Sequence, residues 1–523
     1  MKKKSTWLIF ALCLVLLLSA CSGSDTPPNN SGRDSGVAEP PEVVELNIVA
    51  LKRPEVTKDY NDLEMVQKLL EGTNVKIDWN LVTSDGWGEM KNLMFASGDL
   101  PDALYGVGVL NPQDIVRYGS EGLLIPLEES IEKNAPNLSQ VLEKRPQYRQ
   151  AITAPDGHIY ALPVIAESTH REVFDMFFIN KQWLDELGLE VPKTTEEYIN
   201  VLRAFKQKDP KRTLFTFMFG HPSTYGVTSM FGSFGILDSD THITMLNGKV
   251  VFAPMQEEYK AGVQFFRRLY EEGLIDPESF TQSFAVYSSK IKSPQQVGSA
   301  IFWSNAQMFP DENSPYVAIA PLIGPEGHQM WNRQLSDLQS FGGFAITSSN
   351  PYPVETMKWI DRSYDEDMSI QLSAGPFGKT LELNADGKFK AIPTPEGQIY
   401  SEWRHQYTPG DNAVNAFLRE YDDRNLETIA EVQTKLDLIP IYEPYIPDIE
   451  DVYPQMLMSN EEVEKLADIQ SEIKQYVQQT VSNWIVRGGI ETEWEGYLAH
   501  LKQVGVDEYV SIFKEAYDRT KNS

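Results

Sequence analysis

The length, charge and cysteine content of this chain exclude several classes of protein. Its 523 residues exceed the ~250–300 at which a single hydrophobic core stops growing, so the chain should fold into more than one lobe. The 46 Lys and Arg residues against 75 Asp and Glu residues give a net charge of −29. This argues against nucleic acid and polyanionic ligands, because like charges repel over a Debye length of ~8 Å. Both cysteines, Cys13 and Cys21, lie near the N-terminus, so the rest of the chain has no thiol for a disulfide, a metal cluster or a nucleophile.

The N-terminus has the pattern of an export signal that ends at a cysteine. Three lysines precede twelve apolar residues from Trp7 to Leu18, fewer than the ~18–20 that span a bilayer. The ending LSAC resembles the lipobox of bacterial lipoproteins, in which the signal is removed and the cysteine carries a diacylglycerol. We therefore expect residues 1–20 to be a signal peptide and Cys21 to bear acyl chains such as palmitate, which hold the protein on the outer face of the cell membrane. An ordinary secreted protein is the alternative.

Residues 21–42 predict a flexible tether between the lipid and the folded body. They are rich in Ser, Gly, Pro, Asn and Asp and contain few apolar side chains, so they cannot bury enough surface to offset the entropy lost on ordering. About twenty such residues have an end-to-end distance of roughly 25 Å. Removal of the signal leaves 43 basic residues against 75 acidic ones, a net charge of −32.

The folded body begins with an alternation of strands and helices. In chain order, the hydrophobic periodicity predicts a strand, a helix, a strand, a helix and a strand at 43–51, 63–72, 74–82, 90–98 and 100–106. Such a βαβαβ pattern indicates a parallel sheet with right-handed crossovers. Ligands of these sheets usually lie beyond the carboxyl ends of the strands, which makes Asp102 and Tyr105 candidate binding residues.

The middle of the chain has clear signals for helix ends. A strand runs to Ile179, Asn180 can cap a short helix, and Gly188 can end it. Thr194 and Glu197 form a capping box ahead of a second amphipathic helix.

Later segments continue the mixed pattern and then become helical. Strands are expected near Trp303 and Phe344, and a capping box of Ser459 and Glu462 starts a helical C-terminal region. Together these features predict an α/β fold.

Five segments in order carry a family resemblance. They are ASGDLPDALYG (96–106), DGHIYALPVIAES (156–168), FINKQWLDELGLEVPKTTEEYINVLRAFK (178–206), GGFAITSSNPYPVETMKWID (342–361) and GGIETEWEGYLAHLKQVGVDEYVSIFKEAYDR (488–519). The chain resembles the extracellular solute-binding proteins of family 1, and more narrowly their long, lipid-anchored, oligosaccharide-binding type from Gram-positive bacteria.

This resemblance implies a two-lobed, periplasmic-binding-protein-like clamp with discontinuous lobes, hinge strands and a helical C-terminal region. The chain is expected to cross between lobes near Leu162–Glu167, Ser340–Gly343 and Thr394. The expected lobes are 43–164 with 340–395, and 165–339 with 396–523. Such a protein, which we expect to be a monomer, captures an oligosaccharide in the cleft and closes by a hinge. It then delivers the sugar to the permease subunits of an ABC transporter.

A sugar site needs aromatic planes for the C–H faces and polar groups for the hydroxyls. Glu167 follows the ALPVIAE strand, as a sugar-binding glutamate does in a relative of this family, and the alternative for it is a solvated charge at the hinge. Arg171 is either a ligand or the ion-pair partner of Glu167. Trp303 ends a stretch that in the family brings an aromatic side chain to the cleft. The weaker candidates, for which core packing or an exposed loop is the alternative, are Trp331, Trp403, Arg404 and Tyr407.

No metal, cofactor or catalytic site is expected from the sequence. Where some relatives carry a calcium loop, this chain reads KQKDPKRTLF, in which Lys211 and Arg212 replace oxygen ligands. The sequence has no HExxH, no GxSxG and no phosphate-binding glycine loop. We therefore expect a binding protein rather than an enzyme. The alternatives are a lipid-anchored polysaccharide hydrolase or lyase acting through two carboxylates, and a binder of a peptide or a metal chelate.

Overall fold

The computed structural model describes residues 43–84, 86–168, 172–173, 175–219, 226–293, 297–305, 309, 314–333, 337–396, 398 and 400–522. The expected signal peptide, the tether, Cys21 and Arg171 lie outside these residues. By its contacts the chain divides at Pro41, and the residues from Glu42 onward form the folded body. Within the described part of the chain, no helix has the length and apolar character needed to cross a membrane.

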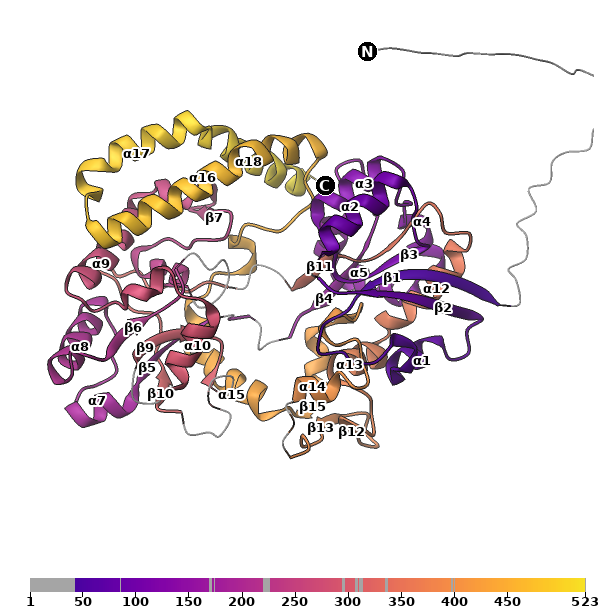
Figure 1. Ribbon diagram of the computed structural model, residues 1–523, viewed down its shortest axis with the longest axis horizontal. Helices are drawn as coiled ribbons and strands as arrows, with labels where there is room; N and C mark the ends of the chain where they lie inside the picture. The colour runs from indigo at the N-terminus through magenta and orange to yellow at the C-terminus, as the bar shows by residue number, and fades with distance from the viewer. Residues whose placement is uncertain are drawn as a thin grey trace, which may run out of the picture. The chain divides into compact units, whose positions relative to one another are not determined.

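The first sheet has six strands in the order β14-β4-β11-β3-β1-β2 (Figure 1). Their bounds are β1 (Val44–Leu51), β2 (Val75–Val82), β3 (Ala103–Leu110), β4 (Leu162–Ala166), β11 (Leu338–Ile346) and β14 (Ala416–Phe417). Strand β1 runs parallel to β2 and β3, which confirms the βαβαβ pattern predicted from the sequence. Strand β11 is antiparallel to both β3 and β4.

Helices cover this sheet and complete its core. They are η1 (Tyr60–Asp62), α1 (Glu64–Leu70), α2 (Trp87–Ser97), α3 (Pro112–Ser120), α4 (Glu128–Asn134), α5 (Pro136–Lys144), α6 (Pro146–Ile152), α12 (Pro353–Asp361), η6 (Arg362–Tyr364) and α13 (Glu366–Ala374). The centre of the core is an aromatic cluster in which Trp79 makes edge contacts with Tyr60, Tyr105 and Trp359 at centroid distances of 5.3, 5.4 and 6.1 Å. Such edge-to-face pairs stabilise a core beyond the area that they bury. We call this sheet with its helices the first lobe.

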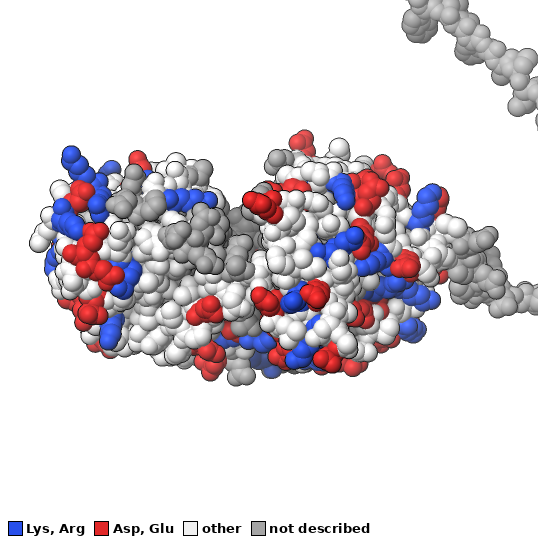
Figure 2. Space-filling model, turned by 90° about the horizontal axis from the view of Figure 1, so that it is seen from below, with Lys and Arg blue, Asp and Glu red and all other residues white. Residues whose placement is uncertain are grey.

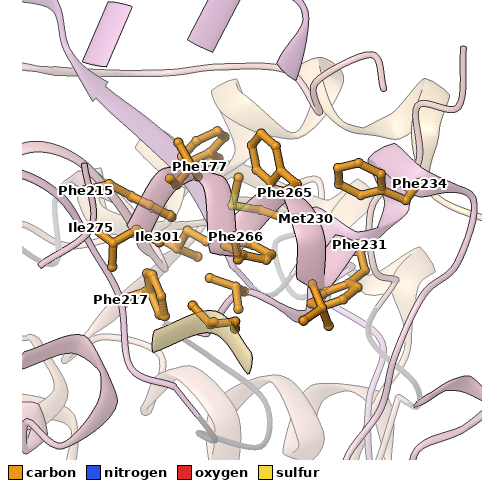
Figure 3. Close-up of a cluster of buried hydrophobic side chains, with 14 of the residues drawn as sticks. Phe177, Phe215, Phe217, Met230, Phe231, Phe234, Phe265, Phe266, Ile275 and Ile301 are labelled. Carbon is orange, nitrogen blue, oxygen red and sulfur yellow. The ribbon is translucent and has the colours of Figure 1, made fainter. Parts of the chain in front are cut away.

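The second lobe is built on a four-stranded sheet in the order β10-β5-β9-β6. Its strands are β5 (Met176–Asn180), β6 (Thr213–Thr216), β9 (Val297–Phe302) and β10 (Tyr316–Ala318), and a separate hairpin joins β7 (Ile243–Leu246) to β8 (Lys249–Phe252). All five residues of β5 and all six of β9 are buried, as expected for strands covered on both faces. Figure 3 shows part of this core, where phenylalanine side chains from several elements, Phe177 and Phe266 among them, meet Met230 and Ile301.

The helix signals read from the sequence are confirmed in this lobe. The helical elements are α7 (Lys181–Leu187), α8 (Thr195–Lys208), η3 (Thr228–Phe234), η4 (Ala253–Met255), α9 (Glu257–Glu271), η5 (Pro277–Phe280) and α10 (Phe284–Lys292). The Asn180 side chain accepts from the Trp183 amide, and α7 ends at Gly188 in the left-handed conformation, with φ 63°. Thr194 and Glu197 form the expected capping box of α8.

The C-terminal region is helical, as predicted. It consists of α16 (Asn460–Arg487), α17 (Ile490–Val504) and α18 (Val506–Asn522), shown in orange to yellow in Figure 1. Ser459 and Glu462 make the capping box that starts α16. Trp484 and Trp494 are buried in the core of the second lobe, with ring centroids 6.0 Å apart. These helices therefore belong to the second lobe.

The segment between α13 and α16 is made of short elements. They are β12 (Leu381–Leu383), β13 (Phe389–Ala391), α14 (Tyr400–Arg404), η7 (Gly410–Asn412), η8 (Arg419–Arg424), β15 (Asn425–Glu427), α15 (Ala430–Leu438), η9 (Ile439–Ile441), η10 (Glu443–Tyr445) and η11 (Ile449–Asp451). Strands β12, β13 and β15 form a small sheet.

One of the three expected lobe crossings is wrong. The chain leaves the first sheet after β4 and returns to it at β11, close to two of the expected crossings. The third expected crossing, at Thr394, is contradicted, because Ala416 pairs with Ile165 and Val414, Ala416, Phe417, Leu418 and Tyr421 lie in the first-lobe core. The chain reaches the second-lobe core at α15, where Leu436 and Leu438 pack against it, and Ile439 is buried in it. The described residues from 400 to 421, expected in the second lobe, thus belong to the first. The two-residue strand β14 was too short to produce a sequence signal.

Charges of both signs are interspersed on the surface. On the face shown in Figure 2, neither Lys and Arg nor Asp and Glu form one continuous patch. This mixed pattern is typical of a solvated protein exterior.

Candidate functional site

A cavity of about 430 Å³ opens where the chain passes between the two lobes. Ile165 and Ala166, at the carboxyl end of β4, line it. The second lobe contributes Trp303, directly after β9, and helix α15 contributes Val432 and Leu436. We call it the Trp303 cavity. It has the position expected for a ligand site in an α/β protein, at the end of strands and between lobes.

The first-lobe wall of the Trp303 cavity is polar. Arg404 of α14 donates from one terminal nitrogen to the Ser373 carbonyl and from the other to Asp411 Oδ1, at 2.6 Å in the second case. Burial alone would raise the pKa of Asp411, but the Arg404 guanidinium outweighs burial and holds that pKa below its usual value. The salt bridge therefore keeps Asp411 charged and fixes the Arg404 side chain in the wall.

Two atoms in this lining lack a partner. Among the described residues, nothing accepts a hydrogen bond from Arg404 Nε and nothing donates one to Asn425 Oδ1, although both atoms are buried. Both side chains line the Trp303 cavity. A buried polar atom without a partner costs about 1–3 kcal/mol, and a ligand hydroxyl beside each atom would remove that cost. One donor and one acceptor are thus available to a polar ligand.

Trp303 supplies the aromatic surface of the cavity. Its side chain is half-buried, and its carbonyl accepts a hydrogen bond of 2.8 Å from Lys435 Nζ. The same ammonium lies 5.2 Å from the centroid of the Trp303 ring. An indole in this position offers a flat apolar plane to a ligand.

The structure brings two of the predicted residues, Trp303 and Arg404, together in one cavity. Trp403 lies next to them but is 8% exposed and packs edge-on against Tyr400, which lines the cavity. Tyr407 is half-buried with Lys58 Nζ 5.8 Å above its ring, and it does not line the cavity. Sugar roles for these two side chains remain predictions.

Trp331 lies in the second-lobe core and not in the cavity lining. It is 1% exposed, its Nε1 donates to the Asp175 carbonyl at 2.9 Å, and its ring lies 5.4 Å from that of Tyr442. The alternative of core packing therefore describes its surroundings.

Glu167 lines a smaller cavity of about 190 Å³. Its sequence neighbours Ala166 and Ser168 line the Trp303 cavity, but the described residues that line the two cavities differ. Its carboxylate is 4% exposed and accepts from Arg145 at 2.7 and 2.9 Å, from Tyr148 Oη at 2.7 Å and from the Arg419 amide at 3.1 Å. Burial alone would raise the pKa of Glu167, but these hydrogen bonds lower it. The carboxylate thus ties together the segments that follow β4 and β14 and is buried, unlike the solvated hinge charge of the alternative. A sugar role for Glu167 remains a prediction.

The expectation that Asp102 and Tyr105 lie at the carboxyl end of a strand is wrong. Strand β3 runs on to Leu110, so Asp102 precedes it at the opposite end, where its carboxylate accepts from the Asn47 amide at 2.7 Å. Tyr105 is 1% exposed, and burial raises its pKa to about 12. The strand was expected at 100–106, but β3 begins at Ala103 and continues through Gly106 and Gly108 to Leu110.

Sequence reasoning missed several lining residues of the Trp303 cavity. Asp411, Asn425, Val432 and Leu436 all belong to the segment of short elements, which has no long hydrophobic period. Only the cluster of Trp403, Arg404 and Tyr407 drew attention to this region.

Two other cavities are at least as large. One, of about 650 Å³, lies between α6 and α18, and the described residues that line it include no aromatic side chain. The other, of about 480 Å³, lies beside the β7–β8 hairpin, within one lobe. The Trp303 cavity is the better candidate because it combines an aromatic plane, unpartnered polar atoms and walls from both lobes.

Residues 54–366 match the family model described as bacterial extracellular solute-binding protein. The chain is 34% identical, over 96% of its length and 96% of the relative's, to the fructooligosaccharide ABC transporter substrate-binding protein FusA of Streptococcus pneumoniae. The structure of FusA in complex with kestose superposes with a TM-score of 0.79, covering 92% of this chain and 100% of FusA.

A more distant structure shows the same fold. It is an HMO-binding, ABC-transporter-associated solute-binding protein from Bifidobacterium longum infantis, 24% identical, with a TM-score of 0.79 over 91% of this chain and 99% of that one. These likenesses confirm the expected two-lobed α/β clamp with a helical C-terminal region. The chain belongs to the bacterial extracellular solute-binding protein family.

Proposed function

We propose that this protein captures a short, uncharged oligosaccharide in the Trp303 cavity and delivers it to the permease of an ABC transporter. The observation that carries the proposal is the combination of the Trp303 plane with unpartnered polar atoms of Arg404 and Asn425 in one cavity. FusA, with 34% identity, is a fructooligosaccharide-binding protein, so fructooligosaccharides are the first ligands to test. The protein is the substrate-binding component of a transporter and not an enzyme.

The cavity fits the two kinds of surface that a sugar presents. The C–H face of a sugar ring gains dispersion contacts against an indole, and Trp303 offers that plane. The hydroxyls need fixed donors and acceptors, which Arg404 Nε and Asn425 Oδ1 supply from the facing wall. A ligand held between the two lobes stabilises the closed clamp only by the contacts that it gains there.

The charges in the lining favour a neutral sugar over a uronic acid oligomer. Asp411 and Asp422 both line the Trp303 cavity, and the guanidinium of Arg404 is already paired with Asp411. Among the described residues that line the cavity, no other cation is left to neutralise a uronate placed beside these carboxylates. Two like charges ~4 Å apart repel by about 1–4 kcal/mol, depending on how far water screens them.

We therefore expect the neutral trisaccharide kestose to bind at least ten times more tightly than trigalacturonate, which corresponds to about 1.4 kcal/mol. Isothermal titration calorimetry of both trimers measures the ratio. The fully methyl-esterified trigalacturonate is the matched control, because it has the same sugar rings without the charge, and it should bind better than the free acid. Equal or tighter binding of the free acid would contradict the assignment to neutral sugars.

We also propose that a lipid on Cys21 holds the protein on the outer face of the cell membrane. The LSAC sequence after a short apolar run supports this proposal. A Cys21→Ser variant should remain unprocessed or be released into the medium, because it cannot receive the diacylglycerol; fractionation of cells and medium measures this. Mature Cys21→Ser protein that still partitions with membranes would rule out the anchor.

We further propose that the protein acts as a monomer. Light scattering of the purified protein should give the mass of one chain, and the mass of a dimer would contradict this proposal.

A further inference from the structure

Helix α15 carries a fully buried lysine directly behind the Trp303 cavity. Lys435 is 0% exposed, whereas Val432 and Leu436 of the same helix line the cavity. Lysine is rarely buried completely, because its ammonium must give up water. Burial accordingly lowers the pKa of Lys435 to about 7, against the opposing attraction of Asp175. An apolar side chain would fill this place without that cost, so the position of the amine calls for an explanation.

The contacts of Lys435 lead to one residue of the cavity. Its Nζ donates to the Trp303 carbonyl at 2.8 Å and lies 5.2 Å from the centroid of the Trp303 ring. A single amine thus restrains both the backbone and the indole of Trp303, through a hydrogen bond and a cation–π contact. Lys435 itself is absent from the cavity lining, so the ammonium covers part of the ring that does not face the cavity.

Asp175 connects this arrangement to the rigid core of the second lobe. It directly precedes β5 and is 4% exposed, and Ser229 Oγ donates to its two carboxylate oxygens at 3.2 and 3.4 Å. Its carbonyl accepts from Trp331 Nε1. The charge that attracts Lys435 is therefore held by the central sheet of the lobe.

We propose that Lys435 is a positioning residue that holds Trp303 against α15, so that the indole and the apolar side chains of Val432 and Leu436 form one platform for the sugar. This inference rests on the proposed function. Holding the platform in place before the ligand arrives reduces the ordering cost of binding. This role requires the amine of Lys435, because an apolar side chain of similar length can neither donate to the Trp303 carbonyl nor make a cation–π contact with its ring.

The test compares Lys435→Met with Lys91→Met in the full chain. Lys91 is the matched control, since it is also buried, at 8% exposure, but pairs with Asp114 on α3 and does not line the cavity. We expect Lys435→Met to bind kestose at least about tenfold more weakly with a melting temperature close to that of the wild type. Lys91→Met should show the opposite pattern, a lower melting temperature with unchanged affinity. Wild-type affinity in folded Lys435→Met would overturn the inference.

A crystal structure of Lys435→Met without sugar separates this inference from the proposed function. The expected result is a Trp303 ring displaced from its wild-type position, and an unmoved ring would overturn the inference even if no oligosaccharide bound to the wild type. Failure of the wild type to bind any oligosaccharide would instead overturn the proposed function. If Lys435→Met does not fold, Lys435→Leu, which also lacks the amine, is measured in the same two ways with the same deciding outcomes.

Discussion

Replacing Trp331 by Ala is expected to destabilise the protein by about 3–5 kcal/mol, because the large side chain is deleted from a packed core and leaves a cavity. Trp331 is 1% exposed and lies 6.4 Å from Phe177 and 5.4 Å from Tyr442, measured between ring centroids. The loss of its Nε1 donor also leaves the Asp175 carbonyl with one hydrogen bond fewer. Denaturant unfolding followed by circular dichroism measures the change in the free energy of unfolding.

The control is Trp331→Phe, which keeps most of the apolar volume and removes the indole N–H. Its loss of stability should fall between the wild type and Trp331→Ala. Both variants should bind sugar normally in the fraction that remains folded. A Trp331→Ala protein that is as stable as the wild type but no longer binds sugar would place Trp331 in the site and contradict its position in the core.

Replacing Trp303 by Ala should have the opposite effect. We expect the affinity for kestose to fall by at least ~2 kcal/mol, or roughly thirtyfold, because a central aromatic contact to the ligand is lost. The free energy of unfolding should change by less than about 1 kcal/mol, since the side chain is only half-buried and the carbonyl bound by Lys435 remains. Calorimetry and thermal unfolding on the same preparation measure both quantities.

Trp303→Tyr provides the matched control, because it retains an aromatic plane at the same place. It should recover a large part of the affinity lost in Trp303→Ala. A destabilised Trp303→Ala protein that binds kestose with wild-type affinity would remove Trp303 from the site.

The elements that local chemistry determines were predictable from the sequence. Periodicity located β1 and β2, and the capping signals at Asn180, Thr194 and Ser459 marked helix starts that the structure confirms. These signals lie within a few residues of one another along the chain. They report local structure and do not depend on how distant segments meet.

The parts that depend on distant segments were not predictable from periodicity. The pairing of Ala416 with Ile165 joins segments about 250 residues apart through a strand of two residues. Without this pairing, the sequence reasoning placed the segment around β14 in the wrong lobe. The ring of a tryptophan gives no local sign of whether it faces a core or a cavity. The family resemblance favoured Trp303 over Trp331, but the contacts in the structure are what place one in the cavity lining and the other in the core.

Polar candidates were uncertain for a related reason. Glu167 was expected at a hinge or at a sugar, and its four hydrogen bonds to Arg145, Tyr148 and Arg419 come from segments that the sequence could not bring together. Arg404 was identified by its aromatic neighbours, but its partner Asp411 lies beyond the end of its helix. The local sequence pattern thus identified Arg404, but Asp411 and Asn425 were found only in the structure.

The central claim, that the Trp303 cavity holds the oligosaccharide, is tested most directly by a crystal structure of this protein with kestose. We expect electron density for the sugar between Trp303 and Arg404, with a ring against the indole and hydroxyls within hydrogen-bonding distance of Arg404 Nε and Asn425 Oδ1. Kestose bound in the cavity of about 480 Å³ beside the β7–β8 hairpin, with the Trp303 cavity empty, would contradict the claim.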